Sequence, residues 1–185
     1  MRMPAALRHA LRWLLVACLA AAYNAARADT VQRVLVLYSN SRPLPANVEF
    51  SEAFERGLRD LPGARLEVLN EYLDSPRFGG TAYEAAMTTY LQGKYSAFAP
   101  DVIVAAAESA LKFLLDHRRE VFPNVPVVHV AIDRAALATF GPLPPDVIGV
   151  PIDYDFRRTM EWALRWHPQA KRLVTVTGSS EWGRA

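Results

Sequence analysis

Polar side chains follow three of the short apolar runs in this chain, at the points where the runs end. The runs span residues 34–38, 102–106 and 125–130, and their composition is typical of strands buried in a parallel sheet. The polar residues that follow them are Ser39, Asn40, Ser41 and Arg42, then Glu108 and Ser109, and finally Asp133. Because ligands bind beyond the carboxyl ends of parallel strands, we expect these side chains to line one small-molecule site.

The chemistry of these groups favours a small polar ligand. Hydroxyls, an amide and a guanidinium at 39–42 precede a helix, where free N–H groups and the positive end of the helix dipole suit a carboxylate. The Glu108 carboxylate could pair with a ligand amine. Each group also has an ordinary structural explanation. Ser and Asn form turns, and an acid such as Glu108 or Asp133 stabilises the first turn of a helix.

Other kinds of site are weakly represented. The histidines after residue 28 are His117, His129 and His167, and none has a second ligand at metal spacing, so we expect no metal. The sequence holds no glycine-rich phosphate loop, zinc-protease or nucleophile-elbow motif, and we expect no cofactor. Ser39 with His129 is the one nucleophile–base pair to propose, but His129 falls inside a strand, where a hydrogen-bonded core residue is expected. We therefore predict binding without turnover.

Strands and helices alternate along the chain. Expected strands lie at 34–38, 66–69, 102–106, 125–130, 147–150 and 172–177, and expected helices at 50–61, 81–91, 111–115 and 156–164. Thr81 and Glu84 have the spacing of a capping box, and Asp153 or Asp155 is expected to open the last helix. Strands separated by helices imply right-handed βαβ units, so the sequence predicts an α/β fold with a doubly wound parallel sheet.

The N-terminus has the pattern of an export signal. Arginines at positions 2, 8 and 12 precede an apolar run at 13–22, and Ala26–Ala28 supplies the small residues of a cleavage site. The run is about half as long as a bilayer span requires. We predict a signal peptide over 1–28, cleavage after Ala28 and a periplasmic mature protein. An uncleaved anchor and a lipobox at 15–18 are the alternatives.

Removal of this signal changes the charge of the chain. The remaining part has 17 basic and 19 acidic residues, and no basic tract remains, so we expect no nucleic-acid partner. Cys18 is the only cysteine and leaves with the signal, so disulfide and thiol chemistry are excluded from the mature part. That part must be stabilised by its apolar core.

Several segments resemble the periplasmic input domain of bacterial sensor histidine kinases, which is similar to the substrate-binding proteins of ABC transporters. They are Val34–Ser39, Leu44–Asn47, Glu71–Asp74, Pro76–Phe78, Tyr90–Tyr95, Pro100–Val104 and Phe122–Val127. The resemblance implies two lobes that close on a ligand. It places the first lobe at 29–150, and a crossover helix and the first strand of an incomplete second lobe at 151–185. The chain is then expected to be a fragment.

The resemblance also implies a function. It puts ligand contacts after the first, third and fourth strands, at Ser39 to Ser41, Glu108 to Ser109, and Asp133. We therefore expect an extracytoplasmic small-molecule-recognition domain for an amino acid or small carboxylate, with a membrane-bound kinase or transporter as partner.

Two alternatives remain open from the residues themselves. One is an exported α/β hydrolase or nucleotide-processing enzyme, which would need a nucleophile and a base within hydrogen-bond reach. The other is a partner-binding module without a ligand, whose sign would be an exposed apolar patch formed by Trp162, Trp166 and Trp182.

Overall fold

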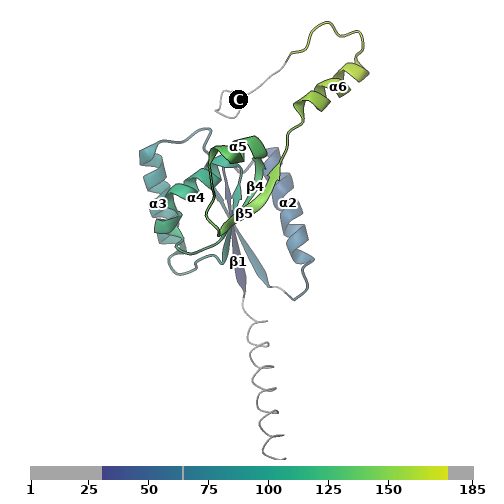
Figure 1. Cartoon of the computed structure of the whole chain (residues 1–185). Coiled ribbons are helices and arrows are strands. Elements are labelled where there is room, and N and C mark those ends of the chain that lie inside the picture. The colour runs from purple at the N-terminus through teal and green to yellow at the C-terminus, as the bar shows by residue number, and fades with distance from the viewer. Residues whose placement is uncertain (1–30, 64, 175–185) are drawn as a thin grey trace, which may run out of the picture.

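A single five-stranded parallel sheet forms the centre of the molecule in the computed structural model, which describes residues 31–63 and 65–174 (Figure 1). Its strands are β1 (Gln32–Tyr38), β2 (Leu66–Tyr72), β3 (Val102–Ala106), β4 (Val127–Asp133) and β5 (Val147–Ile152). Their order across the sheet is β2-β1-β3-β4-β5, and every neighbouring pair is parallel. The predicted α/β fold with a parallel sheet is therefore confirmed.

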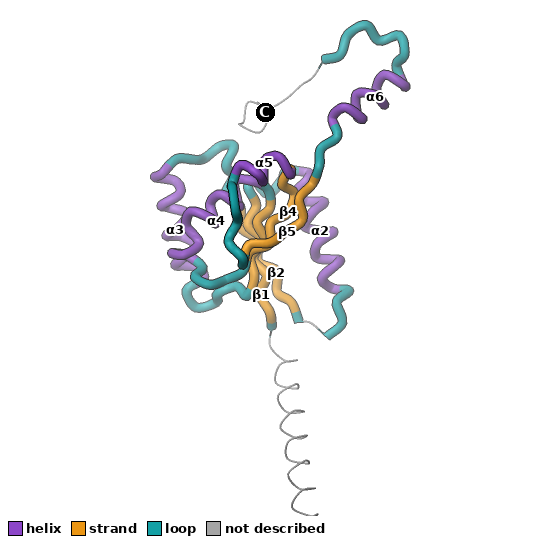
Figure 2. The backbone as a smooth tube through the Cα atoms, in the orientation of Figure 1, coloured by secondary structure: helices purple, strands orange, loops and turns teal. Residues whose placement is uncertain are grey.

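Helices cover both faces of this sheet (Figure 2). They are α2 (Pro45–Arg59), α3 (Thr81–Tyr95), α4 (Glu108–Val121), α5 (Arg134–Thr139) and α6 (Phe156–Trp166). Helices α3, α4 and α5 pack on one face, and α2 packs on the other. Helix α6 buries none of its residues and stands apart from the sheet beyond β5.

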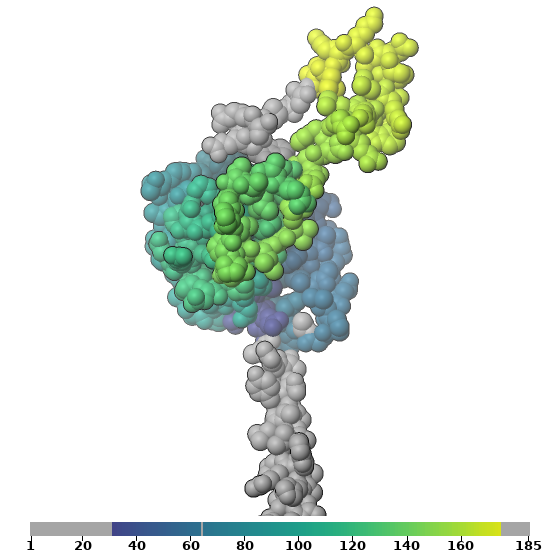
Figure 3. All heavy atoms as spheres, in the orientation of Figure 1, coloured from purple at the N-terminus to yellow at the C-terminus, as the bar shows by residue number. Residues whose placement is uncertain are grey.

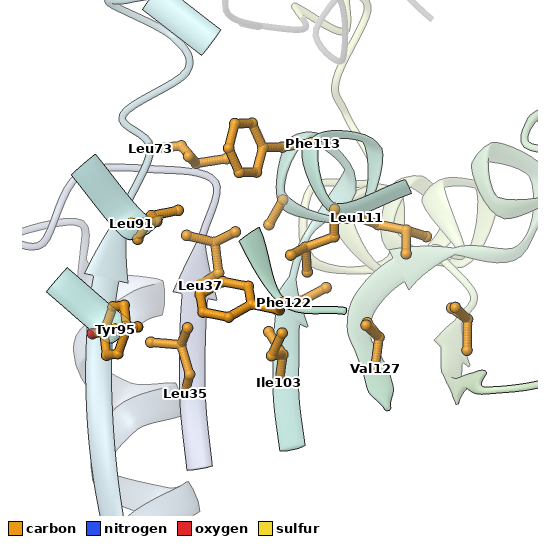
Figure 4. Close-up of a cluster of buried hydrophobic side chains, with 14 of the residues drawn as sticks. Leu35, Leu37, Leu73, Leu91, Tyr95, Ile103, Leu111, Phe113, Phe122 and Val127 are labelled. Atoms are coloured by element: carbon orange, nitrogen blue, oxygen red, sulfur yellow. The ribbon is translucent and has the colours of Figure 1, made fainter. Parts of the chain in front are cut away.

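The larger core lies between the sheet and helices α3 and α4 (Figure 4). Leu35 and Leu37 of β1 are fully buried because β1 has a strand on each side and a helix layer above. Leu91 of α3 and Leu111 of α4 pack against them. Each fully buried Leu contributes about 1.5–3 kcal/mol to stability through the apolar area removed from water. Every second residue of β1 points to this face, and these residues hold α3 and α4 against the strand.

A smaller core lies under α2 on the opposite face. Val36 and Tyr38 point from β1 toward Phe50 and Phe54 of α2. The Tyr38 ring stacks on Tyr72 of β2, with ring centroids 4.8 Å apart. Phe50 and Phe54 of the predicted stripe thus face the sheet, as expected for an amphipathic helix, whereas Leu61 lies beyond the end of α2 and is 51% exposed.

One buried polar cluster joins β2 to α3. Glu71, whose side chain is 8% exposed, accepts hydrogen bonds from the Tyr95 hydroxyl at 2.8 Å and from Lys94 Nζ at 2.5 Å. The Tyr90 hydroxyl lies 3.3 Å from the same carboxylate. Burial and the hydrogen bond to Glu71 both raise the pKa of Tyr95. The hydrogen bond between Lys94 and Glu71 raises the pKa of Lys94. Because a buried carboxylate is costly unless it is paired, the cluster accounts for a charge inside the core.

Four local expectations differ from the structure. Helix α2 begins at Pro45, five residues before the apolar stripe, because proline supplies a helical φ and lacks an N–H that would need an acceptor. The prediction of a capping box is wrong, because Gly80, with φ of 83°, is the N-cap residue of α3. The Glu84 carboxylate instead lies 3.3 Å from Nε2 of His117. Helix α5 was not expected. Residues 172–174 form no strand, and the rest of that expected strand lies outside the described residues.

The expected cap of the last helix is confirmed, whereas two other expectations fall on residues that the structure does not describe. Asp155 caps α6 through a hydrogen bond from the Arg158 amide at 2.8 Å, as one of the two predicted openings. The signal peptide at 1–28 and Trp182 lie outside the described residues. Within residues 31–63 and 65–174, no helix is both long and apolar enough to span a bilayer.

Candidate functional site

A cleft of about 700 Å³ opens at the carboxyl ends of β1, β3 and β4. It is lined by Ser39, Asn40, Leu44, Ala46, Asn47, Phe50, Ser75, Pro76, Ala106, Ala107, Glu108, Ser109, Ala131 and Tyr154. This is the edge of a parallel sheet at which ligands are expected, because the loops and helix N-termini converge there. Four of the predicted residues line it together: Ser39, Asn40, Glu108 and Ser109.

The other three predicted residues are not among those that line the cleft. Ser41 and Arg42 lie in the turn before α2, where the backbone carbonyl of Ser41 accepts from the Asn47 side chain at 3.0 Å. Asp133 is the N-cap residue of α5, and its carboxylate accepts from the Ala135 amide at 2.8 Å. Its other oxygen accepts from the Tyr154 amide at 3.2 Å. These hydrogen bonds lower the pKa of Asp133, so it is an ionised structural cap beside the cleft.

A second hollow, of about 620 Å³, lies at the far end of the sheet. It is formed where α2 ends and β2 begins, between Leu58 and Leu66, and Val31 also lines it. The amino ends of parallel strands present no converging helix N-termini, so this hollow is the weaker candidate for a ligand site.

Ser39 has a structural task at the cleft. Its hydroxyl donates to the carbonyl of Ala106 at 2.9 Å and accepts from the amide of Ala110 at 2.8 Å. Ala107, the N-cap residue of α4, has no side-chain oxygen, so the hydroxyl of Ser39 satisfies the third amide of that helix in its place. Ser39 therefore joins the end of β1 to the start of α4, and a ligand would have to compete with these bonds for its hydroxyl.

We expect Ser39→Ala to lower the free energy of unfolding by about 1–2 kcal/mol, because it leaves a buried amide without an acceptor. Urea unfolding followed by circular dichroism measures this change. Ser109→Ala, at an exposed position in the first turn of the same helix, is the matched control and should change stability by less than about 0.5 kcal/mol. Equal stabilities for the two variants would show that the Ser39 bridge contributes nothing.

Glu108 is the one carboxylate among the residues that line the cleft. It is partly buried, and none of the described residues places a donor within hydrogen-bond distance of its carboxylate. Burial, and secondarily the nearby negative charge of Asp133, raise the pKa of Glu108 above its ordinary value of 4.5. A half-desolvated carboxylate in a concave site gains stability from a cation, so the geometry suits a ligand ammonium group.

Two helix N-termini point into the same cleft as Glu108. The first turn of α4 contributes Glu108 and Ser109, and the first turn of α2 contributes Ala46 and Asn47. The amides of a first helical turn have no acceptor within their own helix. Pro45 has no N–H, the amides of Asn47 and Val48 donate to the Leu44 carbonyl, and that of Ala110 donates to Ser39, which leaves the amides of Ala46 in α2 and of Glu108 and Ser109 in α4. Such amides attract anions through hydrogen bonding and the helix dipole. The cleft thus combines one acid with two positive dipole ends.

The backbone at this edge holds several strained residues. Ala107 and Ala131, both of which line the cleft, have φ of 71° and 56°, and Asp74, next to the cleft residue Ser75, has φ of 49°. Left-handed conformations of non-glycine residues cost of order 1–3 kcal/mol each and gather at functional sites. Asp74 and Ala107 follow the ends of β2 and β3, and Ala131 lies within β4 where its register with β5 shifts, so all three shape the same concave space.

Ten of the fourteen residues that line the cleft were not expected from the sequence, and four of these ten carry polar or aromatic side chains. Asn47 and Phe50 come from the first turns of α2. Their position at the cleft could not be predicted because the helix begins five residues before its apolar stripe. Ser75 follows β2, and Tyr154 follows β5. The proline at position 45 was the available signal for the first pair, since proline is favoured at the first position of a helix.

His129 lies on β4 and is buried, with 2% of its surface exposed, as expected. The expected hydrogen bond is absent at its Nδ1 atom, which has no partner among the described residues. Burial lowers the pKa of His129. The recorded hydrogen bonds of the Ser39 hydroxyl go to Ala106 and Ala110, so the structure does not join Ser39 to His129. The one nucleophile–base pair that the sequence offered is therefore not joined by a hydrogen bond.

Two further expectations concern metals and exposed aromatics. No group of three or more His, Cys, Asp or Glu side chains in residues 31–63 and 65–174 could hold a metal ion. Trp162 and Trp166 are 43% and 73% exposed on α6, which is the apolar surface expected of a partner-binding segment.

No known family model matches this chain, and no curated protein or solved structure is significantly similar to it.

Proposed function

We propose that this chain forms the ligand-binding lobe of an extracytoplasmic small-molecule receptor. The observation that supports the proposal is the cleft at the carboxyl ends of β1, β3 and β4, where polar groups from separate βα units meet. The receptor is either the input domain of a sensor histidine kinase or a solute-binding protein of an ABC transporter, as the sequence resemblance implies. The chemical act is binding, with no turnover.

The polar groups of the cleft suit a ligand that carries both charges, such as an amino acid. An ammonium group would be held by the Glu108 carboxylate, which gains an ion pair in a half-desolvated position. A carboxylate would accept from the first-turn amides that have no acceptor, those of Ala46 in α2 and of Glu108 and Ser109 in α4. Phe50 and Tyr154 line the same space and would contact the apolar part of the ligand. A small carboxylate without an amine would use only the helix N-termini.

A second lobe would complete this site. In the proposed receptor, the crossover after β5 leads into that lobe, which closes on the exposed side of the cleft once a ligand is bound. Closure of this kind works only if the ligand contacts both lobes and so favours the closed state. The signal peptide proposed at 1–28 would deliver the receptor to the periplasm.

A thermal-shift and calorimetric screen of the chain against amino acids and small carboxylates tests the proposal. We expect an amino acid to stabilise the protein, and Glu108→Gln to weaken its binding at least tenfold, or about 1.4 kcal/mol, because a charged hydrogen bond becomes neutral. Because burial raises the pKa of Glu108, wild-type affinity should fall as the pH is lowered, starting above the ordinary glutamate value of 4.5.

Matched measurements separate this role from a general effect of charge. Glu120→Gln removes an exposed carboxylate at the other end of α4 and should leave affinity unchanged. A carboxylate ligand that lacks an amine should bind wild type and Glu108→Gln alike. The proposal fails if no amino acid or small carboxylate stabilises the wild-type chain.

A further inference from the structure

Helix α6 presents a broad apolar surface that the rest of the described chain does not cover. Its large apolar side chains are Phe156, Met160, Trp162, Leu164 and Trp166, each at least 41% exposed. Its charged side chains gather on the opposite side of the helix, at Arg157, Arg158, Glu161 and Arg165. Exposed apolar surface of this extent on a strongly amphipathic helix marks an interaction site.

A second uncovered apolar surface lies on the sheet. Ile148 and Val150 of β5 are 64% and 70% exposed and stand opposite Val128 and Val130 of β4. Paired residues of neighbouring strands point to the same face. Val130 belongs to the smaller core under α2, so this is the α2 face of the sheet. Helix α2 packs over β1, β2 and β3 and leaves the β4–β5 part of that face open.

The segment between β5 and α6 directs the helix away from its own sheet. The Arg134 side chain donates to the Asp153 carboxylate at 3.1 and 3.2 Å, and Asp133 accepts from the Tyr154 amide at 3.2 Å. Asp155 then caps the helix. In Figure 3 the α6 region, in yellow-green, stands off the body formed by the sheet and its other helices. In this arrangement no other described residue covers α6.

Charge distinguishes the two parts of the chain. Residues 31–155 contain 11 basic and 16 acidic side chains, whereas residues 156–174 contain five basic and one acidic. The α6 segment is thus cationic and the α/β body is anionic. Opposite charges attract α6 to the body of another copy and set the orientation of the encounter.

We propose that α6 of one copy packs on the open β4–β5 face of a second copy, and that the exchange is reciprocal. An 11-residue helix is about 16 Å long, close to the length of a six-residue strand of about 20 Å. A two-fold exchange of this kind covers both apolar surfaces of both chains with one type of contact. It concerns a surface distinct from the ligand cleft and stands whether or not a ligand binds.

Chain mixing tests the exchange directly. One variant carries Met160→Cys and the other Val150→Cys, both with Cys18→Ser so that no other thiol is present. After mixing and oxidation, we expect a disulfide between the two different variants, which packing of α6 on its own sheet cannot produce. Glu161→Cys, on the charged side of α6, replaces Met160→Cys in the control mixture and should give at least tenfold less cross-linked product.

Light scattering after gel filtration gives the second measurement. The wild-type chain should have twice the monomer mass, and Leu164→Lys should raise the dissociation constant of the dimer at least tenfold while circular dichroism shows an unchanged fold. A monomeric wild type overturns the proposal, whether α6 folds back on its own sheet or inserts into vesicles that contain anionic lipid. Dimers that form no mixed disulfide also overturn it.

Discussion

Gly149→Ala is expected to lower the free energy of unfolding by about 2–3 kcal/mol, because the added methyl group has no space. Gly149 of β5 pairs with His129 of β4. A Cβ at this position would lie 2.5 Å from Cγ and 2.6 Å from Nδ1 of the His129 ring, and would overlap the backbone carbonyl oxygen of His129. The strand cannot yield easily, because β4 is hydrogen-bonded to β3 on its other side. Urea unfolding measures the loss.

Two further variants make this result specific. Gly57→Ala, in α2, meets nothing within 4 Å and should raise stability by about 0.5–1 kcal/mol, since alanine favours a helix. His129→Ala combined with Gly149→Ala removes the ring contacts but leaves the carbonyl overlap, so it should restore only part of the lost stability. If Gly149→Ala is as stable as wild type, the close approach of the two strands does not exist in solution.

Glu71→Ala is expected to cost about 2–4 kcal/mol of folding free energy, since it removes the acceptor for three donors between β2 and α3. The Tyr95 hydroxyl is buried and would lose its partner. Glu67→Ala is the matched control on the same strand. Glu67 is 51% exposed and pairs with Arg33 at 3.3 Å, and an exposed ion pair contributes about 0–1 kcal/mol. Thermal and urea unfolding compare the two variants.

The pH dependence of this difference identifies its cause. Glu71 raises the pKa of Lys94 above the ordinary 10.5, and burial together with the hydrogen bond to Glu71 raises the pKa of Tyr95 above 10.0. The stability from both shifts is fully present below the ordinary values and is lost as the pH rises through the shifted ones. The gap between wild type and Glu71→Ala should therefore narrow as the pH rises above about 10. A gap that stays constant would assign the effect to packing alone.

Local sequence was sufficient for the strands and most of the helices. The runs at 34–38 and 102–106 are apolar because both faces of a central parallel strand are buried, so composition alone reveals them. The six-residue α5 escaped prediction because it is too short to show a periodic apolar stripe. Gly80 took the capping position that the spacing of Thr81 and Glu84 had indicated, because glycine tolerates the positive φ found there.

The amino-acid sequence was enough to show that polar groups follow buried strands, and that the strands belong to a parallel α/β sheet. Which of those groups are available to a ligand depends on long-range packing and could be seen only in the folded chain. The hydroxyl of Ser39 forms hydrogen bonds with Ala106 and Ala110, which are far from it in the sequence. Asp133 caps a helix that the local sequence pattern does not reveal. Glu108 remains exposed to the cleft, since no donor reaches it from the described segments that meet there. Hydrogen-bond partners are set by which strands become neighbours, and that order depends on the packing of the whole sheet.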